Sequence, residues 1–544
     1  MNARMLLLIT MASFFWGPTS RAQVSFERIL DANKEPENWL TYSGTTLSQR
    51  HSLLNQITPA NVKNLELQWI YQARSLQKFE ATPLVVDGTM YTVQAPNDVL
   101  ALDAATGRVF WTYSYNPGRA HPCCGRVNRG LAILGDTLFM GTIDAHLVAI
   151  DAKNGRPLWN TTIARAKSGY AITHAPLVLK DKVIIGTAGG EYGIRGFIAA
   201  YDAHTGKEAW RFYTIPGPEE PGHETWEGDS WQTGGGPVWM TGSYDPTLNL
   251  TYWGAGNPSP DWNGDVRPGD NLYSDSVVAL DADTGKLKWY YQFTPHDDLD
   301  FDSVQVPVLA DIEWQGQKRK VILWANRNGF FYVLDRLTGQ FLLGKPFAKV
   351  TWARGFDLKG RPVRIPGQTS SLEGTRIYPG NPGATSWYSP SYSPRTGLFY
   401  IPAWANSSSI FMKVPVEYKE GREYAAGIPK SLIPFDWSPA PNFRKEEEGY
   451  GAVRALDPQT GEAKWEFKMT DVTEAGILTT ASDLLFSGGR EGYFYALDAR
   501  TGALLWKTSL GAAVISGPMT YSVGVKQYVA VNAGNCLFTF ALRQ

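Results

Sequence analysis

The chain has 544 residues, and 51 Lys and Arg side chains stand against 52 Asp and Glu, so its formal net charge is −1. A charge so close to zero gives no sign of the excess of basic residues that is typical of nucleic-acid binding, and we expect no nucleic acid partner. Hydrophobic residues make up 43% of the chain, enough for a large core, and 54 Gly residues indicate many tight turns.

The first 22 residues have the pattern of a secretory signal peptide. Arg4 precedes an apolar run from Met5 to Trp16, and the helix-breaking Gly17-Pro18 pair follows before small residues near Ala22. A membrane anchor is the alternative, but a membrane span needs about 20 apolar residues and this run is shorter. We therefore predict cleavage after Ala22, export to the periplasm, no membrane span, and a single mature domain over 23–544.

One phrase recurs seven times along the rest of the chain. An alternating apolar run ends at Asp, two residues follow, then Thr-Gly (once Asn-Gly), three residues and Trp. The seven copies begin at Asp103, Asp151, Asp202, Asp281, Asp335, Asp457 and Asp498, and the Asp335 copy lacks the Trp. The Asp side chain can bond the turn backbone, Gly can take a positive φ, and Trp can pack from the following strand.

The repeat predicts an all-β fold, an eight-bladed β-propeller. Most spacings between copies are near the ~40–50 residues of a four-stranded blade, and one blade cannot bury both of its faces alone. The long interval from Asp335 to Asp457 has room for an unmarked eighth blade. The segment Leu65–Trp69 is predicted to be a strand that completes the last blade and closes the ring. Unrelated hairpins in a β-sandwich are the alternative, which seven copies disfavour.

A loop at 121–130 carries two adjacent cysteines, Cys123 and Cys124, and Cys536 is the third cysteine of the chain. Adjacent Cα atoms lie about 3.8 Å apart, below the roughly 4.4–6.8 Å that is usual for disulfides, so a bond between the two would be strained. Export permits disulfides. The residues alone leave open a bond between neighbours, two free thiols, or one bond to Cys536.

Four oxygen donors suggest a site for a hard cation. Asp300 and Asp302 stand two positions apart and can both supply oxygens, and Glu191 and Asn257 stand upstream. No cluster of His and Cys accompanies them, which disfavours Zn and Cu. A turn position with its side chain in solvent is the alternative for Asp302. With the cysteine pair, these donors indicate a metal-assisted redox site.

The repeated phrase resembles the tryptophan docking motif of quinoproteins, the eight-bladed dehydrogenases that use pyrroloquinoline quinone (PQQ). The resemblance covers nearly all of the mature chain. The repeat alone does not establish an enzyme, because scaffold proteins of outer-membrane assembly share a similar repeat without a cofactor. The cysteine pair and the oxygen donors are what favour the enzyme over such a scaffold.

The resemblance implies how PQQ is held. It implies a disulfide between Cys123 and Cys124 over one face of the quinone, Trp239 stacked on the other face, and Arg129 on a cofactor carboxylate. Arg327 would lie beside the quinone oxygen that is reduced, where a permanent positive charge stabilises the developing anion. The remaining implied contacts are Glu80, Thr173, the Gly189 and Gly190 amides, Ser386 and Trp387. Ser386 departs from the Asn of many members, so its contact stays open.

The resemblance also implies the metal and the base. Glu191, Asn257 and Asp300 match the metal ligands, and Asp300 matches the aspartate that takes the substrate's hydroxyl proton. Members of the calcium type have Ala or another non-coordinating residue where this chain has Asp302. An added carboxylate favours a trivalent ion of similar radius, so we expect La³⁺ or Ce³⁺, with Ca²⁺ as the alternative.

The activity implied is oxidation of an alcohol to an aldehyde, with electrons passed to a soluble cytochrome c. A separate cytochrome is expected because the sequence has no Cys-x-x-Cys-His motif and stops shortly after the last predicted blade. A membrane glucose dehydrogenase would need N-terminal spans. The sequence leaves open which alcohol is used and whether the protein forms a homodimer.

Overall fold

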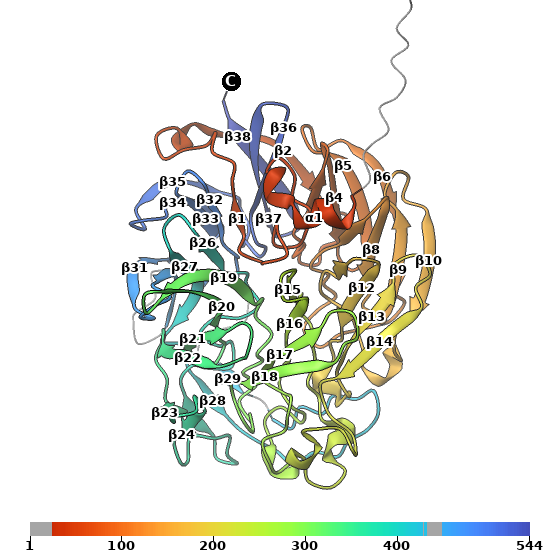
Figure 1. Cartoon of the computed structure of the whole chain (residues 1–544), viewed down its shortest axis with the longest axis vertical. Coiled ribbons are helices and arrows are strands. Elements are labelled where there is room, and N and C mark those ends of the chain that lie inside the picture. The colour runs from red at the N-terminus through yellow and green to blue at the C-terminus, as the bar shows by residue number, and fades with distance from the viewer. Residues whose placement is uncertain (1–23, 428, 432–448, 544) are drawn as a thin grey trace, which may run out of the picture.

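The computed structural model describes residues 24–427, 429–431 and 449–543, and its β-sheets form a ring (Figure 1). Seven four-stranded sheets and one five-stranded sheet make eight blades, which confirms the predicted all-β propeller. The first three blades are β3 (Leu84–Val86), β4 (Thr89–Gln94), β5 (Asp98–Asp103) and β6 (Val109–Tyr113); β7 (Ala132–Leu134), β8 (Thr137–Gly141), β9 (His146–Asp151) and β10 (Pro157–Thr162); and β11 (Leu177–Leu179), β12 (Lys182–Gly186), β13 (Phe197–Asp202) and β14 (Glu208–Tyr213).

The next four blades continue around the ring. The fourth and fifth are β15 (Ser243–Asp245), β16 (Leu250–Gly254), β17 (Ser276–Asp281) and β18 (Leu287–Gln292); and β19 (Val308–Trp314), β20 (Gln317–Ala325), β21 (Phe330–Asp335) and β22 (Phe341–Pro346). The sixth and seventh are β26 (Ser391–Ser393), β27 (Leu398–Ala405), β30 (Tyr450–Leu456) and β31 (Ala463–Lys468); and β32 (Leu478–Thr480), β33 (Leu484–Gly488), β34 (Tyr493–Asp498) and β35 (Leu504–Ser509), which β1 (His51–Ser52) joins in parallel.

The eighth blade joins the two ends of the chain. It contains β36 (Met519–Val523), β37 (Lys526–Ala533), β38 (Cys536–Leu542) and, from the N-terminal side, β2 (Leu65–Gln72). Strands β2 and β38 are antiparallel, with Leu65 opposite Leu542. The predicted closing strand is therefore confirmed.

The unmarked blade was predicted in the wrong place. The interval from Asp335 to Asp457 holds the sixth blade and insertions, and no additional blade lies among its described residues. The insertions form two small sheets, β23 (Ala353–Phe356) with β24 (Pro362–Arg364), and β25 (Thr375–Ile377) with β28 (Ser409–Phe411) and β29 (Lys430–Ser431). The blade without the phrase is the closing one, because the chain termini separate its third and fourth strands and leave no turn between them.

Each docking tryptophan packs against the next blade of the ring. Trp111 on β6 donates its Nε1 hydrogen to the Ala152 carbonyl of the second blade, at 3.2 Å. Gly155 in the same turn has φ +75°, and a Cβ there would lie 2.5 Å from the Trp111 ring. Only glycine fits such a position without strain. Where the fifth blade lacks its Trp, Gly461 of the sixth faces Leu343 and Lys345 instead.

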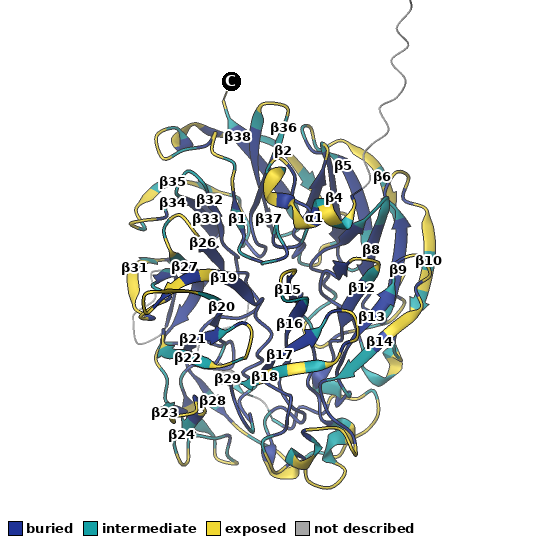
Figure 2. Cartoon of the chain, in the orientation of Figure 1, coloured by how far each residue is buried: buried dark blue, intermediate teal, exposed yellow. Residues whose placement is uncertain are grey.

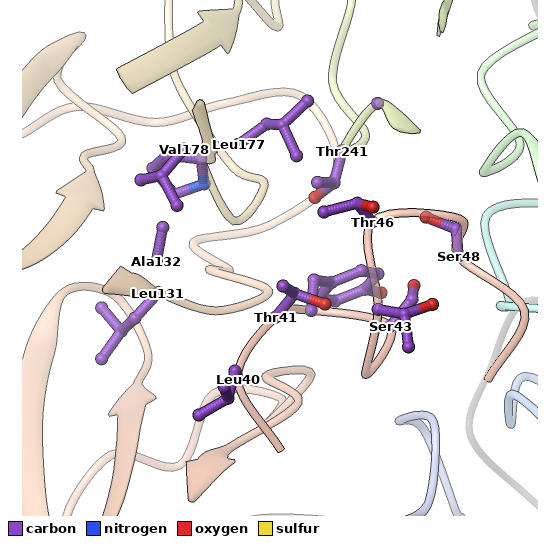
Figure 3. Close-up of a pocket in the computed structure, with 14 residues that line it drawn as sticks. Leu40, Thr41, Ser43, Thr46, Ser48, Leu131, Ala132, Leu177, Val178 and Thr241 are labelled. Atoms are coloured by element: carbon purple, nitrogen blue, oxygen red, sulfur yellow. The ribbon is translucent and has the colours of Figure 1, made fainter. Parts of the chain in front are cut away.

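Burial follows the blade geometry (Figure 2). In the second blade the four central residues of β9 are buried, whereas the outermost strand β10 alternates exposed and half-buried residues. A cavity of only about 20 Å³ lies where the segment 40–48 meets the blades, lined by hydroxyl-bearing residues such as Thr41, Ser43 and Thr241 (Figure 3). That volume is room for about one water molecule, so a cofactor must bind elsewhere.

The helical content is small. One α-helix, α1 (Phe26–Leu30), and short 3₁₀ helices connect the strands: η1 (Ala32–Lys34), η2 (Val62–Asn64), η3 (Ala166–Ser168), η4 (Gly190–Tyr192), η5 (His223–Thr225), η6 (Ser230–Thr233) and η7 (Gly264–Val266). Within the described ranges, no helix is both long and apolar enough to cross a membrane. The predicted signal peptide, residues 1–22, lies outside the described residues.

Candidate active site

A cavity of about 450 Å³ brings together nearly all of the residues that the sequence singled out, and its volume suits a small-molecule ligand. Its lining residues come from loops of several blades: Lys78, Glu80, Pro122, Cys123, Cys124, Gly125, Val127, Arg129, Thr173, Ala188, Gly189, Glu191, Trp239, Asp300, Asp302, Arg327, Pro382, Ser386, Trp387, Tyr388 and Glu474. Two predicted residues, Gly190 and Asn257, are not among its lining residues, and both are buried.

A disulfide joins Cys123 to Cys124 at one wall of this cavity. The pairing implied by the resemblance is therefore confirmed. Cys536 is a free, half-buried thiol on β38. Export or another oxidising environment is consistent with this bond.

Arg129 occupies the polar end of the cavity. Its guanidinium lies 3.0 Å from a carboxylate oxygen of Glu80 and donates to the Thr173 hydroxyl at 3.1 Å. The same group lies 4.5 Å from the ring centroid of Trp387 and 5.1 Å from that of Trp239. Two aromatic faces and one buried carboxylate thus fix a cation where the sequence predicted a carboxylate-binding residue.

Asp302 points into the site and not into solvent. Its Oδ2 accepts from the Arg327 guanidinium at 2.9 Å and from the Trp239 indole at 3.2 Å, and its Oδ1 accepts from the Asn257 backbone N–H at 3.1 Å. The residue is only 5% exposed, so the alternative of a solvent-facing turn residue is wrong. A Cβ on Gly256 would lie 2.0 Å from Asp302 Oδ1, which explains the glycine before Asn257.

Asp300 lies on the other side of the same arginine. Arg327 donates to its Oδ2 at 3.1 Å, and the Asn381 side-chain amide donates to that oxygen at 2.8 Å. Both aspartates adopt left-handed backbone conformations, with φ +57° at Asp300 and +26° at Asp302. Such strained conformations occur where the surroundings over-determine the backbone, frequently at functional sites.

The site holds more negative than positive charge. Burial, together with the negative charge of the Asp302 carboxylate, raises the pKa of Glu191 to about 7. Burial also raises the pKa of Asp300, while the charge of Arg327 opposes the rise. Asp261, four residues after Asn257, is fully buried as well, and burial raises its pKa well above the usual range. Buried carboxylates of this kind are stabilised by a cation.

One observation fits a metal ion directly. The Asn257 side-chain oxygen is buried, and no described residue donates a hydrogen bond to it, so it is an acceptor ready for a cation. Oxygens of Glu191, Asp300 and Asp302 do not all lie within 4.8 Å of one another. In the described part of the chain only Cys123, Cys124 and Glu191 form such a group, and its disulfide sulfurs do not suit a hard cation.

Sequence reasoning missed several residues of the site. Asn381, which holds Asp300, and the facing pair Lys78 and Glu474 lie in segments without a motif. Tyr388 lines the cavity two positions after Ser386. From the sequence we predict that the region around Phe435 to Phe443 helps to form the wall of the substrate pocket, and this region lies outside the described residues. Only proximity in the fold, and no spacing in the sequence, identifies Lys78, Asn381, Tyr388 and Glu474 as residues of the site.

Comparison with known proteins identifies the family to which the chain belongs. A family model described as the β-propeller domain of glucose, ethanol and alcohol dehydrogenases matches residues 39–350, and one for the outer membrane protein assembly factor BamB matches residues 449–540. The quinohaemoprotein alcohol dehydrogenase ADH IIB of Pseudomonas putida is 40% identical over 529 residues, covering 91% of this chain and 73% of that protein.

Two further matches are covered by this chain over most of their length. The lanthanide-dependent methanol dehydrogenase of Methylacidiphilum fumariolicum is 36% identical over 548 residues, covering 95% of this chain and 88% of that protein. A solved structure of a europium-containing methanol dehydrogenase matches with a TM-score of 0.88 at 34% identity, covering 95% of this chain and 100% of the other. On this similarity, the chain belongs to the family of PQQ-dependent quinoprotein alcohol dehydrogenases.

Proposed function

We propose that this protein is a lanthanide-dependent member of the family, an exported dehydrogenase that oxidises an alcohol to an aldehyde and passes the electrons to a soluble cytochrome c. The observation that carries the metal assignment is the position of Asp302. Its carboxylate is buried beside Asp300, Trp239 and Asn257, where it can add a third anionic residue to the oxygen donors.

Charge supports a trivalent ion. With Glu191, Asp300 and Asp302 ionised, the donor residues carry three formal negative charges, and Asn257 adds a neutral oxygen. Coulomb attraction scales with the product of the charges, so La³⁺ or Ce³⁺ gains more than Ca²⁺ from the additional carboxylate. Two relatives are named for a lanthanide, which agrees with this reasoning.

Each side chain around Asp300 then has a role. When bound, PQQ would supply a two-electron acceptor for the oxidation of the alcohol. Asp300 accepts the hydroxyl proton, and Arg327 and Asn381 hold its carboxylate in place. Arg327 also places a fixed positive charge beside the reacting atoms, which stabilises developing negative charge on oxygen. The disulfide and Trp239 would bound the two faces of the ring, and Arg129 with Thr173 its carboxylate edge.

A separate electron acceptor agrees with the sequence. Close relatives are named quinohaemoproteins, and this chain covers about three quarters of their length. In this proposal a cytochrome c partner would supply the haem, and the 544 residues of this chain contain no Cys-x-x-Cys-His haem attachment motif. The N-terminal signal pattern supports an exchange in the periplasm.

A calcium-dependent alcohol dehydrogenase is the second candidate, and one observation favours it. Both oxygens of Asp302 already accept hydrogen bonds, from Trp239, Arg327 and the Asn257 backbone. If those bonds persist in the working enzyme, Asp302 is a structural acceptor, and Glu191 with Asn257 and Asp300 would hold Ca²⁺.

Reconstitution distinguishes the two. Metal-free protein is loaded with PQQ and either La³⁺, Ce³⁺ or Ca²⁺, and dye reduction is measured over a panel of alcohols. We expect strong activation by La³⁺ and Ce³⁺, weak or no activation by Ca²⁺, and loss of lanthanide activation in Asp302→Ala. Equal activation by Ca²⁺, or full lanthanide activity of Asp302→Ala, would establish the calcium candidate.

A further inference from the structure

The cavity contains an ion pair that the proposed function does not use. Lys78 Nζ lies 4.0 Å from Glu474 Oε2, which is an ion-pair distance but too long for a strong hydrogen bond. The Lys78 side chain is 33% exposed and that of Glu474 is 12% exposed. Both line the same cavity as Glu80, Arg129 and Thr173, the residues implied for the cofactor edge.

The backbone holds both partners in place. Lys78 precedes the buried Phe79, whose N–H donates to the Gly534 carbonyl at 3.1 Å. Glu474 follows Thr473, whose hydroxyl donates to the Gly488 carbonyl at 2.7 Å. The side chain of Lys78 is therefore the part that can turn toward a ligand.

The charges of the cavity indicate that the Lys78 ammonium would stabilise a bound anionic ligand. Its lining contains the cations Lys78, Arg129 and Arg327 and the carboxylates Glu80, Glu191, Asp300, Asp302 and Glu474. Arg129 pairs with Glu80 at 3.0 Å, and Arg327 pairs with both aspartates. PQQ carries three carboxylates, and burying a carboxylate costs free energy unless a cation lies nearby.

We propose that Lys78 binds a carboxylate of the quinone, and that Glu474 holds the Lys78 ammonium at the cavity wall until the ligand displaces it. This inference rests on PQQ being the cofactor. Because Lys78 Nζ and Glu474 Oε2 lie 4.0 Å apart, their ion pair restrains the Lys78 ammonium only weakly. Burial raises the pKa of Glu474 to about 7, with Lys78 opposing the rise and Glu80 adding to it, so Glu474 gives up Lys78 readily near neutral pH.

The test is the affinity for the quinone, measured without turnover. Lanthanum-loaded protein without quinone is dialysed to equilibrium against PQQ, and the Kd is measured for wild type, Lys78→Met, Lys78→Arg and Glu474→Gln. Losing one charge-assisted hydrogen bond should raise the Kd of Lys78→Met about ten- to hundredfold. Lys78→Arg keeps the charge and should stay within about threefold of wild type.

The sign of the Glu474 effect separates binding from a purely structural pair. Removing the competing acid removes the ion pair that Lys78 must give up, so Glu474→Gln should bind PQQ as tightly as wild type or about two- to fivefold more tightly. A structural pair would make both single variants weaker by a similar factor. Lys182→Met, which removes an ion-paired lysine from the third blade, is the matched control and should leave the Kd unchanged.

A second ligand locates the contact. The trimethyl ester of PQQ has no free carboxylate, so its Kd should be the same for wild type and Lys78→Met. A Lys78→Met variant that binds PQQ as wild type does, or that weakens the ester equally, overturns the Lys78 assignment alone. A wild-type protein that binds no PQQ overturns both this inference and the proposed function. Unchanged melting temperatures establish that the variants are folded.

Discussion

At the scale of single residues, we predict that turnover depends on the Asp300 side chain. Replacing it by Asn keeps an oxygen for the metal and suits the left-handed backbone, which Asn tolerates better than most residues. The amide cannot accept the hydroxyl proton, so Asp300→Asn should lower kcat at least a hundredfold. Quinone content, measured by absorbance after denaturation, should stay close to that of wild type. Turnover within a few-fold of wild type would place the base elsewhere.

The sequence predicted the acidic part of this site better than its surroundings. Asp300 and Asp302 stand two residues apart in the chain, so a motif could indicate them. Asn381 approaches Asp300 from an insertion after the fifth blade, and Glu474 approaches Lys78 from the segment before the seventh blade. Contacts between segments that are far apart in the sequence give no characteristic residue spacing, so these partners could be identified only from the fold.

At the scale of the blade, the glycine under each docking tryptophan should be intolerant of any side chain. Gly155 has φ +75° and faces the Trp111 ring, whereas Gly397 has φ +70° and nothing within 4 Å of an added Cβ. Both turn amides donate to the residue four positions earlier. Gly155→Ala should therefore lower the melting temperature clearly more than Gly397→Ala, because only it adds a steric clash to the shared backbone strain. Equal losses in thermal unfolding would mean that the ring contact is unimportant.

A buried histidine should make the third blade sensitive to acid. His174 accepts from the Gly186 N–H at 3.0 Å, and burial lowers its pKa to about 4. The unfolded chain, with a pKa near 6.5, binds the proton more readily, so stability is complete above about pH 6.5 and falls toward pH 4. The expected loss is roughly 1.4 kcal/mol per pH unit in that window. The free energy of unfolding, measured by urea unfolding at several pH values, should depend less steeply on pH in His174→Gln than in wild type, by about that amount. An unchanged pH dependence would contradict the role of His174.

The misplaced blade shows what the repeat could predict. The phrase spans the turn between the third and fourth strands of a blade, as at Asp103 between β5 and β6. In the closing blade those strands are β38 and β2, at opposite ends of the described chain, so no turn exists to carry the phrase. Trp69 on β2 nevertheless donates to the Ala104 carbonyl, as Trp111 does to the Ala152 carbonyl. Periodicity thus gave the number of blades, while the closure required the pairing itself.

At the scale of the whole molecule, stability should come from ring closure and not from the disulfide. A bond between neighbouring residues closes almost no loop, so it restricts the unfolded chain very little. Replacing Cys123 and Cys124 by Ser should leave the melting temperature within about 2 °C of wild type and reduce quinone retention. Trp69→Ala removes a buried side chain from the closing blade and should cost about 3–5 kcal/mol. A double Ser variant that melts much earlier would show that the disulfide supports the fold.

The central claim is that the donor set around Asp302 selects a trivalent ion, and competitive metal loading tests it most directly. Metal-free protein with PQQ is equilibrated with equal concentrations of La³⁺ and Ca²⁺, desalted, and analysed for bound metal by mass spectrometry. We predict about one La³⁺ per chain and almost no Ca²⁺ in wild type, and a marked loss of La³⁺ in Asp302→Ala. Wild-type protein that retains Ca²⁺ in preference to La³⁺, or Asp302→Ala that retains La³⁺ as wild type does, would contradict the account.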